Sequence, residues 1–279
     1  MTLDLATVPR VDLFVAGPPC QPFSGMNQKR RSARRMDDRV GVLHTCLKYI
    51  LEKQPRVALI ENVPSLARFW DISENDNRGA DGESSFESTW ASTVAPIITH
   101  LASVYTIHKK VLTPLHFNCP QSRPRMYVVF TTNSDFGFPA AIPLTTTTRE
   151  VVGAYPLNPL DASALVLTRE ARKVLARART KFGEDWQCGV NNINSLGIIV
   201  AQRSTPHPIR EHAHCLIAKG PSLCNTLMRH LSREENAAFQ GFPRGMNQCY
   251  DRITHRQHVK LIGNAMNVAV LTHLLLKAC

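Results

Sequence analysis

Residues 11–16, V-D-L-F-V-A, form a short apolar run that stops abruptly at residues 17–20, G-P-P-C. Such a run predicts a buried strand that ends in a loop. A second apolar run covers residues 57–60, and residues 42–52 between the two carry leucine and isoleucine at helical spacing. A third run, residues 126–130, follows a polar segment. This order predicts an α/β fold with a parallel sheet, whose functional groups gather at the carboxyl ends of the strands.

The composition is that of a globular protein with an excess of positive charge. The chain has 279 residues, of which 43% are hydrophobic, and its formal net charge is +11. These values exclude a disordered or fibrous chain, and the length suits one large domain or two modest ones. No stretch approaches the ~18 uninterrupted apolar residues of a membrane span, so no membrane contact is expected. The charge favours an anionic partner such as nucleic acid, although a basic enzyme without such a partner remains an alternative.

The cysteines and histidines do not predict a metal centre or a disulfide framework. None of the eight cysteines belongs to a C-x-x-C pair, and their spacing is irregular. Free thiols in a reducing compartment are therefore expected. A cluster made of His207, His212, His214 and Cys215 matches no familiar zinc spacing, so we expect no metal there.

Cys20 is the candidate nucleophile. It directly follows the first predicted strand, and the two prolines before it stiffen the loop that carries it. A reactive cysteine needs an exposed, electropositive position of this kind. The alternative is a buried core cysteine, the usual fate of this residue type, which a proline-rich loop disfavours.

Several motifs together resemble those of the cytosine-5 methyltransferases. The loop G-P-P-C-Q-P-F-S, residues 17–24, is similar to the catalytic loop of that family. The other motifs follow in the family's order: Asp37-Asp38-Arg39 with Gln54-Pro55, then Glu61-Asn62-Val63, Pro120-Gln121-Ser122-Arg123-Pro124-Arg125, Leu231 to Glu235 with Gln240 to Pro243, and Gly263-Asn264-Ala265. Each motif alone is weak, but their common order over almost the whole chain is specific.

The resemblance implies an enzyme that methylates cytosine in DNA with S-adenosylmethionine as cofactor. Cys20 would add to carbon 6 of the base, while Glu61 would contact ring nitrogen 3 and the exocyclic amine. Arg125, with Arg123 behind it, would hold the 2-carbonyl and balance its growing negative charge. Read without the resemblance, Glu61 has the capping of a following helix as its alternative role, and the two arginines would be taken first as solvated side chains beside a strand.

The resemblance also implies contacts with double-stranded DNA, from which the target base must be flipped. Residues 25–39 follow the nucleophile and carry six basic side chains, Lys29, Arg30, Arg31, Arg34, Arg35 and Arg39, which we expect to meet phosphates together with Gln21 and Ser24. A solvated loop or a nuclear-import signal is the alternative interpretation of this basic segment. An intracellular protein is expected, nuclear in a eukaryote or cytoplasmic in a bacterium.

The chain also departs from the family pattern. The family's Gly-rich strand, loop and helix, which receives S-adenosylmethionine, has no match here. We therefore expect a Rossmann-like methyltransferase sheet that lacks its first βαβ unit, with cofactor contacts left to Asp4, Gly17, Pro19, Asn264 and Ala265. We expect a second chain, or an upstream extension of this one, to supply the missing unit.

The expected division has three parts: residues 1–130 form a partial catalytic domain, residues 131–225 an inserted target-recognition region, and residues 226–279 return to the catalytic domain. Two other functions stay open, namely a catalytically inactive DNA-binding fragment or subunit, and a tRNA cytosine-5 methyltransferase. The long middle region favours DNA over tRNA.

Overall fold

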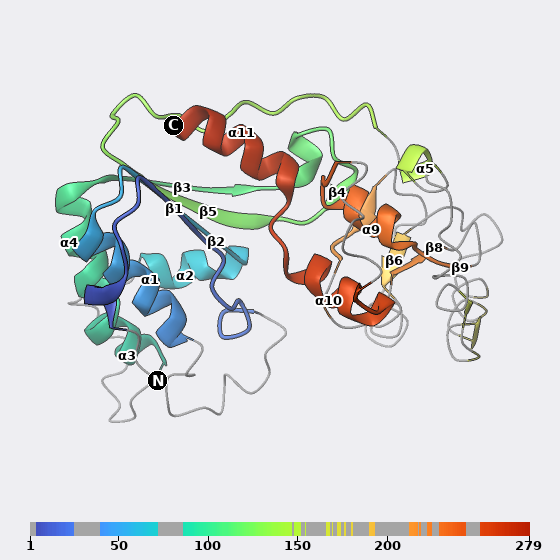
Figure 1. Cartoon of the computed structure of the whole chain (residues 1–279), viewed down its shortest axis with the longest axis horizontal. Coiled ribbons are helices and arrows are strands. Elements are labelled where there is room, and N and C mark those ends of the chain that lie inside the picture. Colours follow the sequence, from blue (N-terminus) through green and yellow to red (C-terminus); the bar gives the residue numbers. More distant parts are fainter. Residues whose placement is uncertain are drawn as a thin grey trace. The chain divides into compact units, whose positions relative to one another are not determined.

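The computed structural model describes residues 4–24, 40–71, 86–146, 148–151, 190–192, 212–216, 222–224, 229–243 and 252–279, with a few single positions between 154 and 218. The chain divides into two compact units (Figure 1). Unit 1 consists of Met1–Leu112, Pro124–Pro139 and Leu274–Cys279, and unit 2 consists of Thr113–Arg123 and Ala140–His273. The chain therefore passes from one unit to the other at residues 112/113, 123/124, 139/140 and 273/274.

Unit 1 is built on a four-stranded sheet in the order β1-β2-β5-β3. Its strands are β1 (Leu13–Ala16), β2 (Val57–Asn62), β3 (Thr106–Leu112) and β5 (Arg125–Thr131). The three apolar runs of the sequence become β1, β2 and β5, as predicted, and β1 and β2 are parallel. The third strand departs from this parallel pattern, because β5 begins at the end of the sheet where β1 and β2 finish and so runs antiparallel to β2 and β3.

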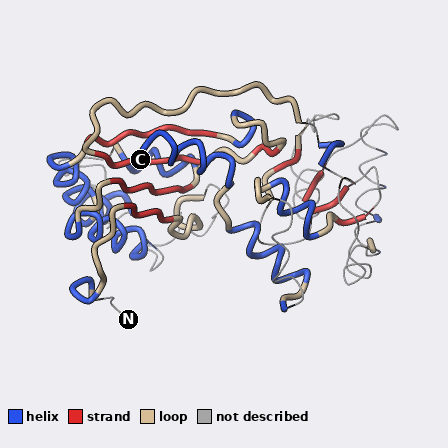
Figure 2. Tube along the Cα trace, turned by 45° about the horizontal axis from the view of Figure 1, so that its top comes forward, coloured by secondary structure: helices blue, strands red, loops and turns tan. Residues whose placement is uncertain are grey.

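Helices cover both faces of this sheet (Figures 1 and 2). One face carries α1 (Val40–Lys53), α2 (Ala67–Trp70), α3 (Phe86–Thr93) and α4 (Ala95–Val104), and short 3-10 turns lie at Leu5–Thr7 (η1) and Pro64–Leu66 (η3). The predicted amphipathic helix is confirmed as α1, which buries Leu43, Leu47 and Ile50. The other face carries the last turn of α11 (Val268–Ala278), in which Leu274 and Ala278 are buried.

Unit 2 has smaller elements and its own core. Its helices are α5 (Thr148–Val151), α9 (Arg233–Phe239), α10 (His255–Asn264) and the start of α11, with a 3-10 turn at Pro114–His116 (η4). Its short strands are β4 (Gln121–Ser122) paired with β7 (Ala213–His214), and the series β6 (Val190–Asn192), β8 (Ser222–Cys224) and β9 (Arg229–His230). Leu216, Leu231, Phe239 and Ile262 form part of its core.

The stretch His255–Ala278 is long and apolar enough to cross a membrane by length and composition alone. It is nevertheless two helices, because α10 ends at Asn264 and α11 begins at Val268. Between them, the buried Asn267 side chain donates to the carbonyl oxygen of Phe239 at 3.3 Å and accepts from Val270 N–H at 3.2 Å. A buried polar break of this kind is typical of two helices packed within a folded chain.

The predicted three-part division stays a prediction. Most residues of the expected recognition region, 131–225, lie outside those that the structure describes.

Candidate active site

The Cys20 loop follows β1 directly and is fixed to its neighbours at both ends. At its start, the Asn62 side chain at the end of β2 donates to the carbonyl oxygen of Pro18 at 3.1 Å. At its end, the Ser65 hydroxyl donates to the carbonyl oxygen of Phe23, whose fully buried ring lies 5.7 Å from that of Trp90. These anchors hold the loop, and Cys20 between them remains half-buried with a free thiol.

A tight turn shapes the loop just after the cysteine. The backbone N–H groups of Phe23 and Ser24 both donate to the carbonyl oxygen of Cys20, at 3.1 and 3.0 Å. Gln21 is exposed on this turn and Ser24 is half-buried. The turn therefore presents the thiol and Gln21 beyond the end of the strand while Phe23 points into the core.

Glu61 and Arg125 form an ion pair at the same edge of the sheet. Glu61 lies near the end of β2 and Arg125 is the first residue of β5, and the antiparallel register that pairs Glu61 with Tyr127 brings them together. Arg125 Nε lies 3.2 Å from Glu61 Oε1, with the two side chains 14% and 11% exposed. Arg125 also donates through Nη1 to the carbonyl oxygen of Pro124 at 2.8 Å.

The pair places a carboxylate and a guanidinium side by side in a largely dehydrated position. The guanidinium and the carboxylate attract each other, and the low local dielectric strengthens the action of both groups on a bound ligand. Cys20, Glu61 and Arg125 all belong to unit 1. The structure brings these three predicted residues to the same end of its sheet, where β1 and β2 finish and β5 begins. This end of the sheet therefore carries a thiol, a carboxylate and a guanidinium.

Arg123 has entirely different surroundings. It belongs to unit 2, is 4% exposed, and donates to the carbonyl oxygens of Leu216 at 2.9 Å, Gly263 at 3.2 Å and Ala265 at 2.9 Å. Its guanidinium thus ties three segments of unit 2 together. A direct contact between Arg123 and the base stays a prediction from the resemblance.

The residues expected to bind a cofactor are divided between the two units. Gly17 is exposed in the Cys20 loop of unit 1, beside the half-buried Pro19, and Asn264 is exposed at the end of α10 in unit 2. Ala265 has its carbonyl oxygen held by Arg123 and by Gln240 Nε2 at 2.8 Å. Asp4 instead caps η1, accepting from Ala6 N–H at 3.0 Å.

Some predicted residues cannot be placed. Lys29, Arg30, Arg31, Arg34, Arg35 and Arg39 lie outside the described residues, as does His207. Among the side chains that are described, no three of His, Cys, Asp and Glu come close enough together to hold a metal ion. Cys215 instead lies 3.3 Å from Arg123 Nη1.

Sequence reasoning missed the residues that position the site. Asn62 and Ser65 hold the Cys20 loop, and Gln240 holds the segment around Ala265. Asn62 and Gln240 stand inside quoted motifs, but their roles depend on acceptors far away in the sequence. Ser65 carries no sequence signal beyond its position after the second strand.

Comparison with known proteins identifies the family of this chain. The model of the C-5 cytosine-specific DNA methylases matches residues 2–278. The chain belongs to this family. Among related C5 methyltransferases, the type II methyltransferase M.MspI of Moraxella sp is 25% identical over 273 residues, which are 97% of this chain and 56% of that protein. M.NgoBI of Neisseria gonorrhoeae is 27% identical over 279 residues, covering 96% of this chain and 74% of the relative.

A solved methyltransferase structure has the same fold. EhMeth of Entamoeba histolytica superimposes with a TM-score of 0.61 at 15% identity, over 96% of this chain and 76% of EhMeth. The predicted α/β methyltransferase fold is thereby confirmed. The chain spans little more than half the length of M.MspI and about three quarters of M.NgoBI and EhMeth.

Proposed function

We propose that this chain carries the catalytic residues of a DNA cytosine-5 methyltransferase, with Cys20 as covalent nucleophile. The observation that carries the proposal is the Glu61–Arg125 ion pair, formed at the sheet edge to which Asn62 anchors the Cys20 loop. Family membership and the names of the related enzymes support the same chemistry. A base stacked in duplex DNA must leave the helix to reach these groups.

In the proposed reaction the Cys20 thiolate forms a bond from Sγ to carbon 6 of the flipped cytosine. The ring electrons move toward carbon 5 while Glu61 passes a proton to nitrogen 3, and Arg125 balances the charge on the 2-carbonyl. S-adenosylmethionine, when bound, supplies the methyl group that carbon 5 receives, with Gly17, Pro19, Asn264 and Ala265 among its contacts. Transfer of the carbon 5 proton to water, with return of the nitrogen 3 proton to Glu61, then restores the double bond between carbons 5 and 6 and expels Cys20 as a thiolate.

Covalent trapping tests the role of Cys20. Duplex DNA in which 5-fluorocytosine replaces every cytosine removes the need to know the target sequence, because fluorine at carbon 5 blocks the last proton loss. With S-adenosylmethionine and any partner chain required for activity, the protein should form an adduct that survives denaturation. Cys20→Ser should abolish it, whereas Cys279→Ser, which removes an exposed thiol elsewhere in unit 1, should not. An adduct that persists in Cys20→Ser contradicts the assignment.

We also propose that the basic segment of residues 25–39 binds DNA phosphates, because it follows the nucleophile and concentrates positive charge. Replacing Lys29, Arg30, Arg31, Arg34 and Arg35 by glutamine should flatten the dependence of DNA affinity on salt, by roughly 0.9 in logarithmic slope for each lost contact. The matched control replaces Lys48 and Arg56, which are exposed basic residues of unit 1. Equal slopes for the wild type and the five-fold variant would refute the contact.

Finally, we propose that activity requires a further unit of the fold, supplied by a second chain or by an upstream extension of this one. The family's Gly-rich cofactor loop has no match in these residues, and the related proteins are longer than the part that this chain matches. The cofactor contacts expected in this chain are correspondingly few.

A further inference from the structure

The Cys20 loop and the segment that follows β2 leave the sheet side by side. Strands β1 and β2 are parallel neighbours, with Ala16 in register with Ile60. The loop after β1, residues 17–24, therefore lies next to residues 63–70, which form η3 and α2. The chain that ends the second strand is thus in a position to hold the loop that follows the first.

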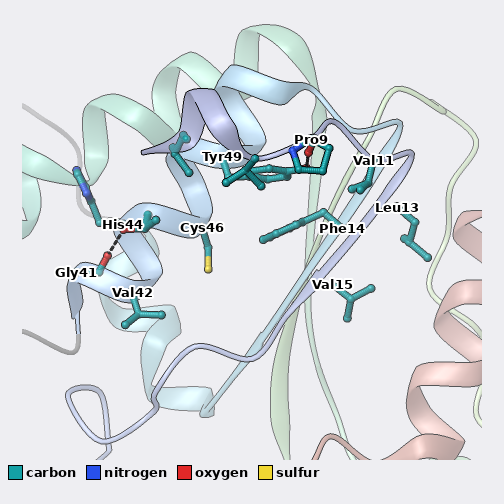
Figure 3. Close-up of a pocket in the computed structure, with 13 residues that line it drawn as sticks. Pro9, Val11, Leu13, Phe14, Val15, Gly41, Val42, His44, Cys46 and Tyr49 are labelled. Carbon is teal, nitrogen blue, oxygen red and sulfur yellow. Dashed lines mark hydrogen bonds between the residues drawn. The ribbon is translucent and has the colours of Figure 1, made fainter. Parts of the chain in front are cut away.

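Strand β1 gives this loop a fixed base. The ring of Phe14 stacks on that of Tyr49 in α1, with centroids 4.7 Å apart, and the Tyr49 hydroxyl donates to the carbonyl oxygen of Pro9 at 2.7 Å (Figure 3). These contacts lie in the wall of an apolar cavity of about 880 Å³ beside β1. Because the strand and the segment before it are held on α1, the position of Cys20 depends on the loop itself.

Two side chains at and after the end of β2 hold the loop on either side of Cys20. Asn62 donates to the carbonyl oxygen of Pro18, two residues before the cysteine, at 3.1 Å. The Ser65 hydroxyl donates to the carbonyl oxygen of Phe23, three residues after it. The fully buried ring of Phe23 is packed as well, but ring packing does not determine the direction in which its carbonyl group points.

The contact made by Ser65 reaches Cys20 through one peptide group. The carbonyl group of Phe23 and the N–H group of Ser24 belong to the same planar peptide unit. Ser65 binds the oxygen of this unit, and its N–H donates to the carbonyl oxygen of Cys20 at 3.0 Å. Rotation of the plane would break both hydrogen bonds, so the Ser65 hydroxyl determines its orientation.

The Ser65 hydroxyl is itself held in place. Ser65 is the middle residue of η3, and the ring of Pro64 fixes φ at the first residue of this turn. The third residue, Leu66, is fully buried in the core of unit 1, and its N–H donates to the carbonyl oxygen of Val63 at 3.0 Å. A hydroxyl on such a short, anchored turn restrains the loop instead of following its movements.

We propose that Ser65 is a positioning residue for the covalent step of the reaction. Its hydroxyl orients the peptide plane that holds the Cys20 carbonyl group and thereby fixes the thiol relative to Glu61, which stands four positions earlier on the same segment. The inference rests on the proposed function, in which the thiol and the carboxylate must meet one base together. A small displacement of a nucleophile from the atom that it attacks is costly in rate.

The rate of covalent trapping tests this role. Saturating duplex DNA that contains 5-fluorocytosine, with S-adenosylmethionine and any further unit required for activity, gives the rate of adduct formation. Ser65→Ala should lower this rate by about tenfold to hundredfold, because the thiol is no longer held in line with the base. The Kd of unmodified duplex DNA should stay unchanged. Ser65→Thr keeps a hydroxyl at this position and should restore the rate of the wild type.

Hydrogen exchange tests the same contact in the 279-residue chain without DNA. The amides of Phe23 and Ser24, which form the turn, should exchange faster in Ser65→Ala than in the wild type or in Ser65→Thr. Thr45→Val is the matched control, because the Thr45 hydroxyl also donates to a backbone carbonyl oxygen, that of Gly41 in α1, at 2.8 Å. It should change neither the exchange nor the trapping rate. Far-ultraviolet circular dichroism verifies that each variant retains the fold.

Three results would overturn the inference: a normal trapping rate in Ser65→Ala, an equal loss of rate in Ser65→Ala and Ser65→Thr, or a loss explained entirely by weaker DNA binding. Each of them leaves Cys20 as the nucleophile. Absence of an adduct in the wild type, together with the expected change in exchange, would instead contradict the proposed function while supporting Ser65 as the residue that orders the loop.

Discussion

Arg123 and Arg125 are two positions apart and carry the same charge, yet only Arg125 is paired with a carboxylate at the candidate site. Arg125 lies 3.2 Å from Glu61, whereas the Arg123 guanidinium is directed at backbone carbonyl oxygens of unit 2. Proline at position 124 separates them. Substitution of Arg125 is therefore expected to lower the rate of catalysis, whereas substitution of Arg123 is expected to lower the stability of unit 2.

Arg125→Ala should lower the rate of methyl transfer by roughly 10²- to 10³-fold, the usual effect of removing a donor from a developing oxyanion. The free energy of unfolding should change far less than the activation free energy. Single-turnover kinetics with the active assembly measure the first and urea denaturation the second. Arg56→Ala, at an exposed arginine of unit 1, is the control. A normal rate for Arg125→Ala would leave the arginine as a structural partner of Glu61.

His258 makes the stability of unit 2 depend on pH. Burial, followed by the charges of His255 and Arg233, lowers the pKa of His258 from 6.5 to about 4. Between these values the unfolded chain binds a proton that the folded chain does not, so the free energy of unfolding falls as the pH drops through this window. Above pH 6.5 both states are neutral at this position and the effect vanishes.

Urea denaturation at pH 7.5 and pH 5 measures this effect. The wild type should lose about 2 kcal/mol more than His258→Gln between the two pH values, because the variant has no proton to bind there. His100→Gln, at an exposed histidine, should behave as the wild type. Equal losses in the wild type and His258→Gln would show that the stability change arises elsewhere.

At the scale of elements, α9 begins with a buried capping box that also holds an ion pair. Glu235 is fully buried, accepts from Ser232 N–H at 2.8 Å, and binds both terminal nitrogens of Arg229 at 2.7 and 2.8 Å. The Ser232 hydroxyl in turn accepts from Glu235 N–H. The Glu235 carboxylate therefore caps the start of α9, holds β9 through Arg229, and balances the charge of that largely buried arginine.

Glu235→Ala should reduce the free energy of unfolding by about 3–5 kcal/mol, since it leaves Arg229 largely buried without its partner. The matched control is Gln257→Ala, at the equivalent position of the exposed capping box of α10, with an expected cost of about 1 kcal/mol. Urea denaturation measures both. Similar costs at the two positions would mean that the ion pair adds nothing to the cap.

The elements with a local signal were predictable, and those set by distant partners were not. The runs that become β1, β2 and β5 are apolar over four or more residues, and α1 has helical periodicity, so each could be assigned without its neighbours. The direction of β5 depends on the pairing of Val57 with Thr131, which no local pattern encodes. For β3 the sequence T-I-H-K-K-V-L reads as polar, because an edge strand needs no continuous apolar run.

Only those residues of the candidate site that stand in recognisable motifs could be predicted from the sequence. Cys20, Glu61 and Arg125 stand in the quoted motifs, and all three come to one sheet edge. The surroundings of Arg123 were not predictable from the sequence. Its acceptors at Leu216, Gly263 and Ala265 are distant in sequence, and they are backbone carbonyl oxygens, which every type of residue has.

At the scale of the whole molecule, the isolated chain should bind S-adenosylmethionine weakly or not at all and should not methylate DNA. The cofactor contacts expected of this chain, such as Gly17 and Asn264, are few, and Asp4 caps its own turn. Titration calorimetry of the purified chain with S-adenosylmethionine checks the expectation. Micromolar binding by a stable monomer that methylates DNA unaided would contradict it.

The chain crosses between the two units four times, and these crossings determine how proteolysis and truncation affect each unit. Unit 1 is assembled from three separate stretches of sequence, and the last passage falls inside helix α11. A protease that cuts one passage leaves three intact, so the nicked halves stay tethered under native conditions. Neither unit corresponds to a continuous stretch that could be expressed alone. Truncation from the N-terminus as far as Leu112 would remove residues of unit 1 alone, whereas a truncation that reaches further into the chain would remove parts of both units.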